Sequence, residues 1–166
     1  YIRKTPVITL PEGAFGIEAH LTLKLELMQH SGSFKARGAF NRILQNTVPP
    51  SGVIAASGGN HGGAVAYAAR RLGYPAEIFV PTICSPTKVQ RLKDYGAQVT
   101  IVGRDYIEAL GECDRRATQT QSLIVHAFDQ SEVIAGQGTV GLELEKQAPG
   151  LDTVLVSVGG GGLIAG

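Results

Sequence analysis

The chain has 166 residues, which is enough for one sizeable hydrophobic core or two small ones. Hydrophobic residues make up 43% of the sequence and charged residues 17%, a composition typical of a globular protein rather than a disordered one. The net charge of +1 gives no reason to expect nucleic acid or an anionic membrane as a partner, and no apolar run approaches the length of a membrane span.

Strand-like apolar runs alternate with helical patterns along the chain. In chain order, we predict strands at 21–27, 52–57, 76–81, 97–103, 123–128 and 152–158, the last of them buried. We predict helices at 34–44, 61–73, 85–96, 105–121 and 131–147. Pro86 suits the first turn of the third helix and Gly96 suits its end. This alternation predicts an α/β fold in which largely parallel sheets are covered by helices on both faces.

The two cysteines and the end of the chain carry less specific information. Cys84 and Cys113 lack a metal-type spacing, so we expect inert, reduced thiols, no metal site and a cytoplasmic location. The chain stops at Gly166, where a helix should begin, so we expect it to be part of a longer protein. No functional role is expected for His20, His30 and His126.

Lys35 lies just inside the first turn of the first predicted helix, for which Ser33 is a plausible N-cap. The N-terminus of a helix carries partial positive charge, so a cation is disfavoured there. A surface lysine that tolerates a small penalty would explain the pattern. Alternatively, the position lowers the pKa of Lys35 and frees its amine for covalent chemistry. This stretch alone favours the surface lysine.

Two glycine-rich stretches each follow a predicted strand and open a helix. In SGGNHGG (57–63), Asn60 suits an N-cap, but the exposed backbone N–H groups also suit a carboxylate or phosphate. In VGGGGLIAG (158–166), four consecutive glycines cost roughly 1 kcal/mol each relative to alanine, which indicates close approach of a ligand such as phosphate. Gly160, Gly162 and Ala165 also fit the dinucleotide pattern, so a Rossmann nicotinamide site stays open.

A third stretch, GQGTVG at 136–141, matches the dinucleotide pattern letter for letter. It lies inside a predicted helix and not at a strand–helix junction. Small residues for helix packing explain it better than a nucleotide site does.

The motifs GSFKARGA, SGGNHG and GGGGL, in this order, resemble the pyridoxal-phosphate enzymes of the tryptophan synthase β fold. The stretches LTLKLELMQHSGSFKARGA and EVIAGQGTVGLELE are most similar to the threonine/serine dehydratase and serine racemase branch. The resemblance runs from Thr5 to the last residue. It implies the N-terminal half of a truncated two-domain, fold-type-II enzyme. Residues 1–48 would lie in the large domain, 49–129 in the small domain and 130–166 in the large domain again, with a hinge near 46–52.

The resemblance implies pyridoxal 5'-phosphate as the cofactor, with Lys35 as the Schiff-base lysine and the general base. Phe34 would flank the cofactor ring, and Asn60 would hydrogen-bond its phenolic oxygen. The phosphate would be bound by the tetraglycine bend, which consists of Gly159, Gly160, Gly161, Gly162 and the N–H of Leu163. The substrate carboxylate would be bound by Ser57, Gly58, Asn60 and His61.

The resemblance also implies a reaction, the conversion of L-threonine or L-serine to a 2-oxo acid and ammonia. The GNH sequence at 59–61 is similar to that of dehydratases and racemases. Racemases often carry a serine in the slot of Gly58, and its hydroxyl can protonate the opposite face of the substrate carbanion. Glycine cannot do so, which favours elimination and leaves racemisation as the alternative. A homodimer of the full-length protein is expected.

Overall fold

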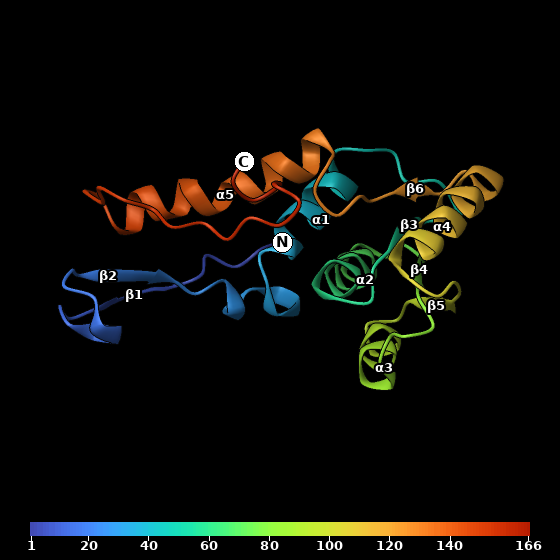
Figure 1. The fold of residues 1–166 in the computed structure, drawn as a ribbon. Coiled ribbons are helices and arrows are strands. Elements are labelled where there is room, and N and C mark those ends of the chain that lie inside the picture. The colour runs from blue at the N-terminus through green and yellow to red at the C-terminus, as the bar shows by residue number, and fades with distance from the viewer.

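A four-stranded parallel sheet forms the centre of one half of the molecule, and the computed structural model describes all 166 residues (Figure 1). Its strand order is β5-β4-β3-β6. The strands are β3 (Val53–Ala56), β4 (Ala76–Val80), β5 (Gln98–Ile101) and β6 (Leu123–Ile124). The helices that connect them are α2 (Asn60–Leu72), α3 (Pro86–Asp94) and α4 (Tyr106–Thr120). The predicted parallel α/β architecture is confirmed.

Helices cover both faces of this sheet. Val53 and Ala55 of β3 belong to the larger hydrophobic core, which also contains buried residues of α1 (Lys35–Leu44), α2 and α3. Ile54 of β3 points to the other face, where it joins a smaller core with Cys113 of α4. Successive side chains of a strand point to opposite faces, so the continuous apolar run of β3 is the pattern of a strand that is buried on both sides.

The other half of the molecule is built from the N-terminal segment, α1 and α5 (Ser131–Gln147). An antiparallel hairpin of β1 (Val7–Leu10) and β2 (Leu21–Lys24) extends beside the C-terminal part of α5 (Figure 1). Three short 3-10 turns complete this segment: η1 (Ala14–Gly16), η2 (Glu26–Met28) and η3 (His30–Gly32). No helix of the structure is long and apolar enough to span a bilayer.

The GQGTVG stretch lies within α5, as its interpretation as packing residues predicts. A Cβ on Gly136 would come within 2.7 Å of the carbonyl oxygen of Arg37 and of the Cα of Gly38, both in α1. Real Cβ atoms do not make such short contacts with backbone. Glycine at this position therefore allows α1 and α5 to pack closely.

Three predictions about local structure are wrong. The predicted strand 21–27 ends at Lys24, because Leu25 leaves the extended conformation and the chain turns into η2. The strand predicted at 123–128 ends at Ile124, since only Leu123 and Ile124 pair with β3. Residues 152–158 form no strand, and all but Val156 are exposed. A strand requires a neighbour to accept and donate its backbone hydrogen bonds, and no other strand lies beside this segment.

Both predicted helix caps are also wrong. α1 has Phe34 as its N-cap residue, and no side chain caps the helix. Ser33 is in extended conformation, and its buried hydroxyl has no hydrogen-bond partner. Gly59 is the N-cap of α2, so Asn60 is the first residue of that helix instead.

Candidate active site

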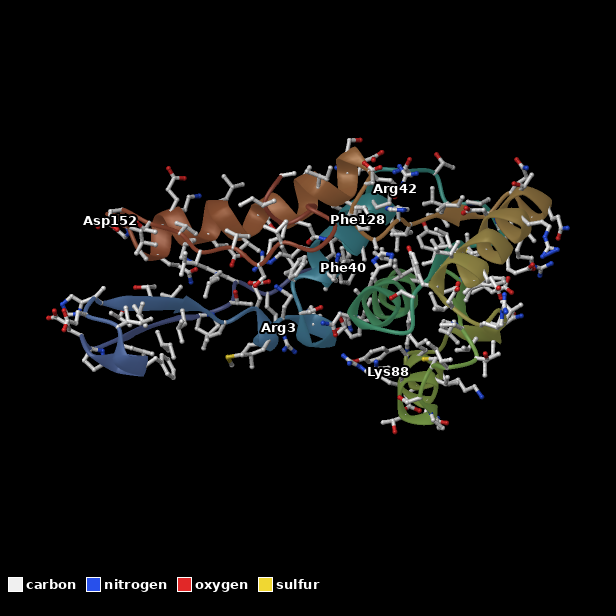
Figure 2. All side chains as sticks on the ribbon, in the orientation of Figure 1. Arg3, Phe40, Arg42, Lys88, Phe128 and Asp152 are labelled. Atoms are coloured by element: carbon white, nitrogen blue, oxygen red, sulfur yellow. The ribbon has the colours of Figure 1, made fainter.

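The connection between β6 and α5 brings the predicted loops together. The Nε2 atom of His61 lies 2.8 Å from the carbonyl oxygen of Val125. The Nζ atom of Lys35 donates a hydrogen bond of 2.5 Å to the carbonyl oxygen of Ala127. Phe128, beside α1 in Figure 2, packs against the tetraglycine bend. Lys35, the start of α2 and the bend therefore converge on residues 125–128.

Lys35 is the first residue of α1 and is half-buried, so it is not a surface lysine. Burial disfavours the charged form and lowers the pKa of the Lys35 amine below that of an ordinary lysine. The Nζ atom also lies 5.1 Å from the centre of the Phe34 ring. Burial thus shifts the Lys35 amine toward its neutral form, which is the state that a nucleophile or a general base needs.

His61 is buried, and burial lowers the pKa of its imidazole to about 4, with the nearby charge of Lys35 as a smaller cause. The imidazole is therefore neutral near pH 7. Because a carbonyl oxygen can only accept, the contact with Val125 assigns the proton to Nε2. The side chain of His61 is thus bound to the β6–α5 connection. Of His61, only the backbone N–H is available to a ligand at the start of α2.

The start of α2 presents unpaired donors. Helix geometry leaves the first backbone N–H groups of α2, including those of Asn60 and His61, without a partner inside the helix. Ser57 accepts a hydrogen bond from the N–H of Gly59 at 3.2 Å, and the exposed Asn60 makes no side-chain cap. Gly58 lies against the thiol of Cys84. This arrangement suits an anion such as a carboxylate.

The tetraglycine bend has a packed side and an open side. A Cβ on Gly160 or Gly162 would collide with Phe128, whereas a Cβ on Gly159 or Gly161 would meet no atom within 4 Å. Gly161 has a φ of +87°, a conformation that favours glycine. The half-buried Leu163 follows directly. The open glycines leave main chain accessible to a ligand.

Sequence reasoning missed the backbone that organises this site. Residues 125–128 were predicted to continue a strand, although their carbonyl groups contact Lys35 and His61. His126 has a structural role, because its Nδ1 accepts a hydrogen bond from the N–H of Asp129 at 3.0 Å. A carbonyl group carries no residue-specific signal, so these contacts cannot be found from residue types.

The family model described as "Pyridoxal-phosphate dependent enzyme" matches residues 1–166. The chain belongs to this family. Its members use pyridoxal phosphate, and the site fits that group: a half-buried amine, an adjacent aromatic ring, open glycines and the unpaired hydroxyl of Ser33 lie on the segments that the family motifs predict. Membership in this family favours cofactor phosphate over a nicotinamide dinucleotide at the tetraglycine bend.

Within the pyridoxal-phosphate family, the chain is similar to enzymes that are named for their action on L-threonine. The chain is 40% identical over 167 residues to an L-threonine ammonia-lyase of Geobacter sulfurreducens, covering 99% of the chain and 42% of the relative. It is 43% identical over 169 residues to the catabolic L-threonine dehydratase TdcB of Staphylococcus aureus, covering 100% and 49%. The chain therefore spans about half the length of the curated relatives that it matches.

Solved structures of serine racemase and threonine deaminase have the same fold. Maize serine racemase superposes with a TM-score of 0.92 at 36% identity, over 99% of this chain and 50% of that chain. Threonine deaminase isoform 2 of Solanum lycopersicum superposes with a TM-score of 0.90 at 33% identity, over 98% and 46%. The predicted fold-type-II architecture is confirmed by these matches.

Proposed function

We propose that the protein to which this chain belongs is a pyridoxal-phosphate-dependent ammonia-lyase that converts L-threonine or L-serine to a 2-oxo acid and ammonia. The observation that carries this proposal is the half-buried amine of Lys35, which contacts the same connection as the tetraglycine bend and the start of α2. The relatives named threonine ammonia-lyase and threonine dehydratase support this reaction class.

The cofactor would be held at three points. Lys35 would bind its aldehyde, with Phe34 beside the ring and Asn60 at the phenolic oxygen. The phosphate would be held by the main chain of the tetraglycine bend, namely Gly159, Gly160, Gly161, Gly162 and Leu163. When bound, pyridoxal phosphate supplies a sink for the electron pair that remains when a substrate loses its Cα proton.

Lys35 acts as the general base in this proposal. Its amine must be neutral to accept the Cα proton, and burial favours that form by lowering its pKa. The carbonyl of Ala127 accepts a hydrogen bond from Nζ and thereby fixes the direction of the amine. Burial and the contact with Ala127 thus support the proposal, because the first favours the neutral form of the base and the second holds its position.

The substrate carboxylate would bind at the start of α2. The free N–H groups of Asn60 and His61, with the hydroxyl of Ser57 and the backbone of Gly58, form the proposed anion site. A carboxylate fixed there orients the Cα–H bond toward Lys35, which converts an encounter of two groups into a reaction within one complex. His61 contributes through its backbone, because its imidazole is bound to Val125.

Racemisation is the second candidate, and the likeness to maize serine racemase favours it. A racemase needs a proton donor on each face of the substrate Cα. Gly58 offers no side chain for the second face, which supports elimination as the main reaction.

The domain division and the cellular setting are part of the same proposal. Residues 1–48 and 130–166 would belong to the large domain and 49–129 to the small domain. Both cysteines are free thiols, which supports a reducing, cytoplasmic location. The resemblance alone supports assembly as a homodimer.

The test compares Lys35→Ala with Lys88→Ala in the full-length protein. Lys88 is exposed on α3 (Figure 2) and serves as a control for the general loss of a lysine. We expect Lys35→Ala to abolish the yellow adduct that borohydride reduces, and Lys88→Ala to retain it. The parent protein should form a 2-oxo acid from L-threonine without added nicotinamide. An adduct that survives Lys35→Ala, or strict dependence on nicotinamide, would contradict the proposal.

A further inference from the structure

Arg37 follows Lys35 by two residues in α1 and is 1% exposed. Its Nε and Nη2 atoms donate to the two carboxylate oxygens of Glu26 at 2.8 and 2.7 Å. Its Nη1 and Nη2 atoms donate to the two oxygens of Glu143 at 2.7 and 2.9 Å. The guanidinium is therefore held by two bidentate ion pairs, the geometry that best fixes the orientation of an arginine.

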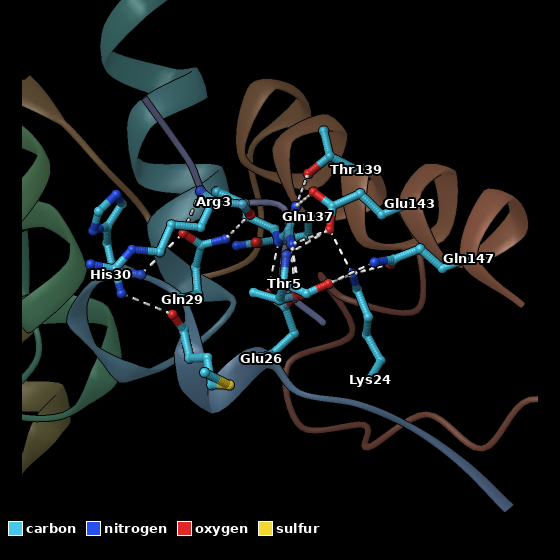
Figure 3. A network of polar contacts seen from close by, with 12 residues as sticks. Arg3, Thr5, Lys24, Glu26, Gln29, His30, Gln137, Thr139, Glu143 and Gln147 are labelled. Atoms are coloured by element: carbon cyan, nitrogen blue, oxygen red, sulfur yellow. Dashed lines mark hydrogen bonds and ion pairs between the residues drawn. The ribbon is translucent and has the colours of Figure 1, made fainter. Parts of the chain in front are cut away.

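Further contacts extend this network to Thr5, to Lys24 and to Thr139 (Figure 3). Thr5, in the N-terminal segment, donates a hydrogen bond of 2.5 Å to Glu26 of η2. Thr139 of α5 accepts a hydrogen bond of 3.0 Å from Arg37. Lys24 of β2 pairs with Glu143 at 2.6 Å. The N-terminal segment, η2, α1 and α5 thus meet at one buried cation.

A buried ion network of this kind adds geometric definition more than stability. Removing charges from water offsets most of their mutual attraction, and apolar side chains of similar volume often stabilise a core as well. The planar fork of arginine specifies direction, however, and a lysine in its place would not. Arg37 therefore fixes the position of the backbone that carries it.

That backbone also carries Lys35. Lys35 and Arg37 share the first turn of α1, so a helical turn of fixed geometry links the guanidinium to the amine. The partner of the amine, Ala127, lies four residues before Ser131, where α5 begins. Arg37 binds Glu143 and so joins α1, which carries the Lys35 amine, to α5. Since α5 directly follows the segment that contains Ala127, this contact also holds the donor and the acceptor near each other.

We propose that Arg37 is a positioning residue for Lys35: its two bidentate contacts hold the first turn of α1 so that the amine stays in its half-buried place beside the Ala127 carbonyl. This inference rests on the proposed function of Lys35. Beyond that function, it couples the geometry of Arg37 to that of Lys35 through the first turn of α1.

The test measures the pKa of the Lys35 amine in the full-length protein after removal of the cofactor, which would otherwise block it. Competitive labelling with an amine reagent across a pH series, read by mass spectrometry, reports this pKa directly. We compare Arg37→Lys, which keeps the charge but loses the fork, with Arg42→Lys. Arg42 is a matched control, because it also joins α1 to α5, through a 2.7 Å ion pair with Glu132.

In Arg37→Lys, the loosened turn lets the amine reach water, so we expect the pKa of Lys35 to rise toward the ordinary lysine value of about 10.4. A rise of about one unit would lower the neutral fraction of the amine near pH 8 about tenfold. Arg42→Lys should leave the labelling curve of Lys35 unchanged. A folded Arg37→Lys protein with an unshifted curve would overturn the proposal, and so would an equal shift in Arg42→Lys.

Should Arg37→Lys not fold, Glu26→Gln provides the second measurement. It removes the charge of one carboxylate with little change in shape, and we expect a smaller shift in the same direction. An unshifted Lys35 curve in that variant would also overturn the proposal. The labelling does not depend on bound cofactor, so its failure is distinct from failure of the borohydride test of the proposed function.

Discussion

Gly58 and Cys84 lie so close together that a Cβ on residue 58 would come within 2.5 Å of the Cys84 Sγ. The thiol therefore occupies the space that a side chain at position 58 would need. Cys84 is half-buried and follows β4, so it reaches the loop that contains Gly58 from the end of the neighbouring strand. A cysteine that the sequence suggested to be inert thus borders the proposed anion site.

Gly58→Ser is expected to be poorly tolerated unless Cys84 is also changed. The new side chain would displace the thiol, and overpacking of this kind costs about 1–3 kcal/mol. Gly58→Ser with Cys84→Ala should recover most of the free energy of unfolding, measured by denaturant titration of the full-length protein. The double variant should also form more D-serine from L-serine than the parent does, because a hydroxyl now borders the second face. Equal stability of Gly58→Ser and the parent would contradict the steric part.

Local signals in the sequence were sufficient to predict the helices around the parallel sheet. Pro86 at the first turn of α3 and the residue Gly73 after α2, with a φ of +80°, act within one element each. A strand, in contrast, needs a neighbouring strand for its backbone hydrogen bonds. The prediction failed at 152–158 because this apolar segment has no neighbouring strand. The cap at Ser33 failed because Phe34 is the N-cap residue of α1 and the buried hydroxyl of Ser33 makes no hydrogen bond to the first turn.

The candidate site shows the same division. Lys35 and the glycine-rich stretches are candidates from the sequence alone, because their residue types are unusual for a helix start or a turn. The acceptor Ala127 and the positioning residue Arg37 could not be predicted, because they act through contacts with segments far away in the sequence. Nothing in the sequence around Arg37 indicates that Glu26 and Glu143 both pair with it in the folded protein.

His61 should make stability depend on pH between about 6.5 and 4. Its pKa is about 4 in the folded state, below the ordinary value of about 6.5, so the unfolded chain takes up a proton in this range before the folded protein does. Stability is therefore complete above pH 6.5 and falls as the pH drops toward 4. The expected loss is roughly 3 kcal/mol for a shift of this size, and denaturant titrations along a pH series measure it.

His61→Gln is the control for this pH dependence. Glutamine keeps an N–H that can reach the Val125 carbonyl, but it does not titrate. The variant should lose the slope between pH 6.5 and 4 while keeping the acid loss due to Glu143. The pKa of Glu143 is about 2, because hydrogen bonds from Arg37 and Lys24 outweigh the effect of burial. The stability that Glu143 contributes is therefore lost only as the pH falls from about 4.5 to 2. If His61→Gln keeps the parent's slope above pH 4.5, His61 is not the cause of that slope.

Within the tetraglycine bend, Gly162→Ala and Gly159→Ala should differ. A Cβ on Gly162 would come within 2.9 Å of the backbone of Phe128, whereas one on Gly159 meets nothing within 4 Å. We expect Gly162→Ala to lower the free energy of unfolding by about 1–3 kcal/mol and to reduce cofactor occupancy. Gly159→Ala should keep the parent stability, so any loss of cofactor absorbance in that variant would report crowding of the phosphate itself. Equal unfolding curves for the two variants would contradict the packing of Phe128 into the bend.

Two of the three glycines of α5, Gly136 and Gly141, test whether GQGTVG is a helix-packing stretch. Gly136→Ala would place a methyl group within 2.7 Å of the α1 backbone, which cannot move away without separating the helices, so we expect a loss of about 1–3 kcal/mol. Gly141 is exposed in the same helix with nothing within 4 Å of a Cβ, and alanine there should stabilise the helix by up to about 1 kcal/mol.

Thermal unfolding of the full-length protein measures both changes, and they should have opposite signs. A nucleotide-binding loop would instead make both alanines harmful to ligand binding and neither helpful to the fold. Because α1 carries Lys35, the separation of helices in Gly136→Ala should also weaken cofactor retention, while Gly141→Ala leaves it intact. Destabilisation by both substitutions would contradict the assignment of these glycines to the packed and exposed faces of α5.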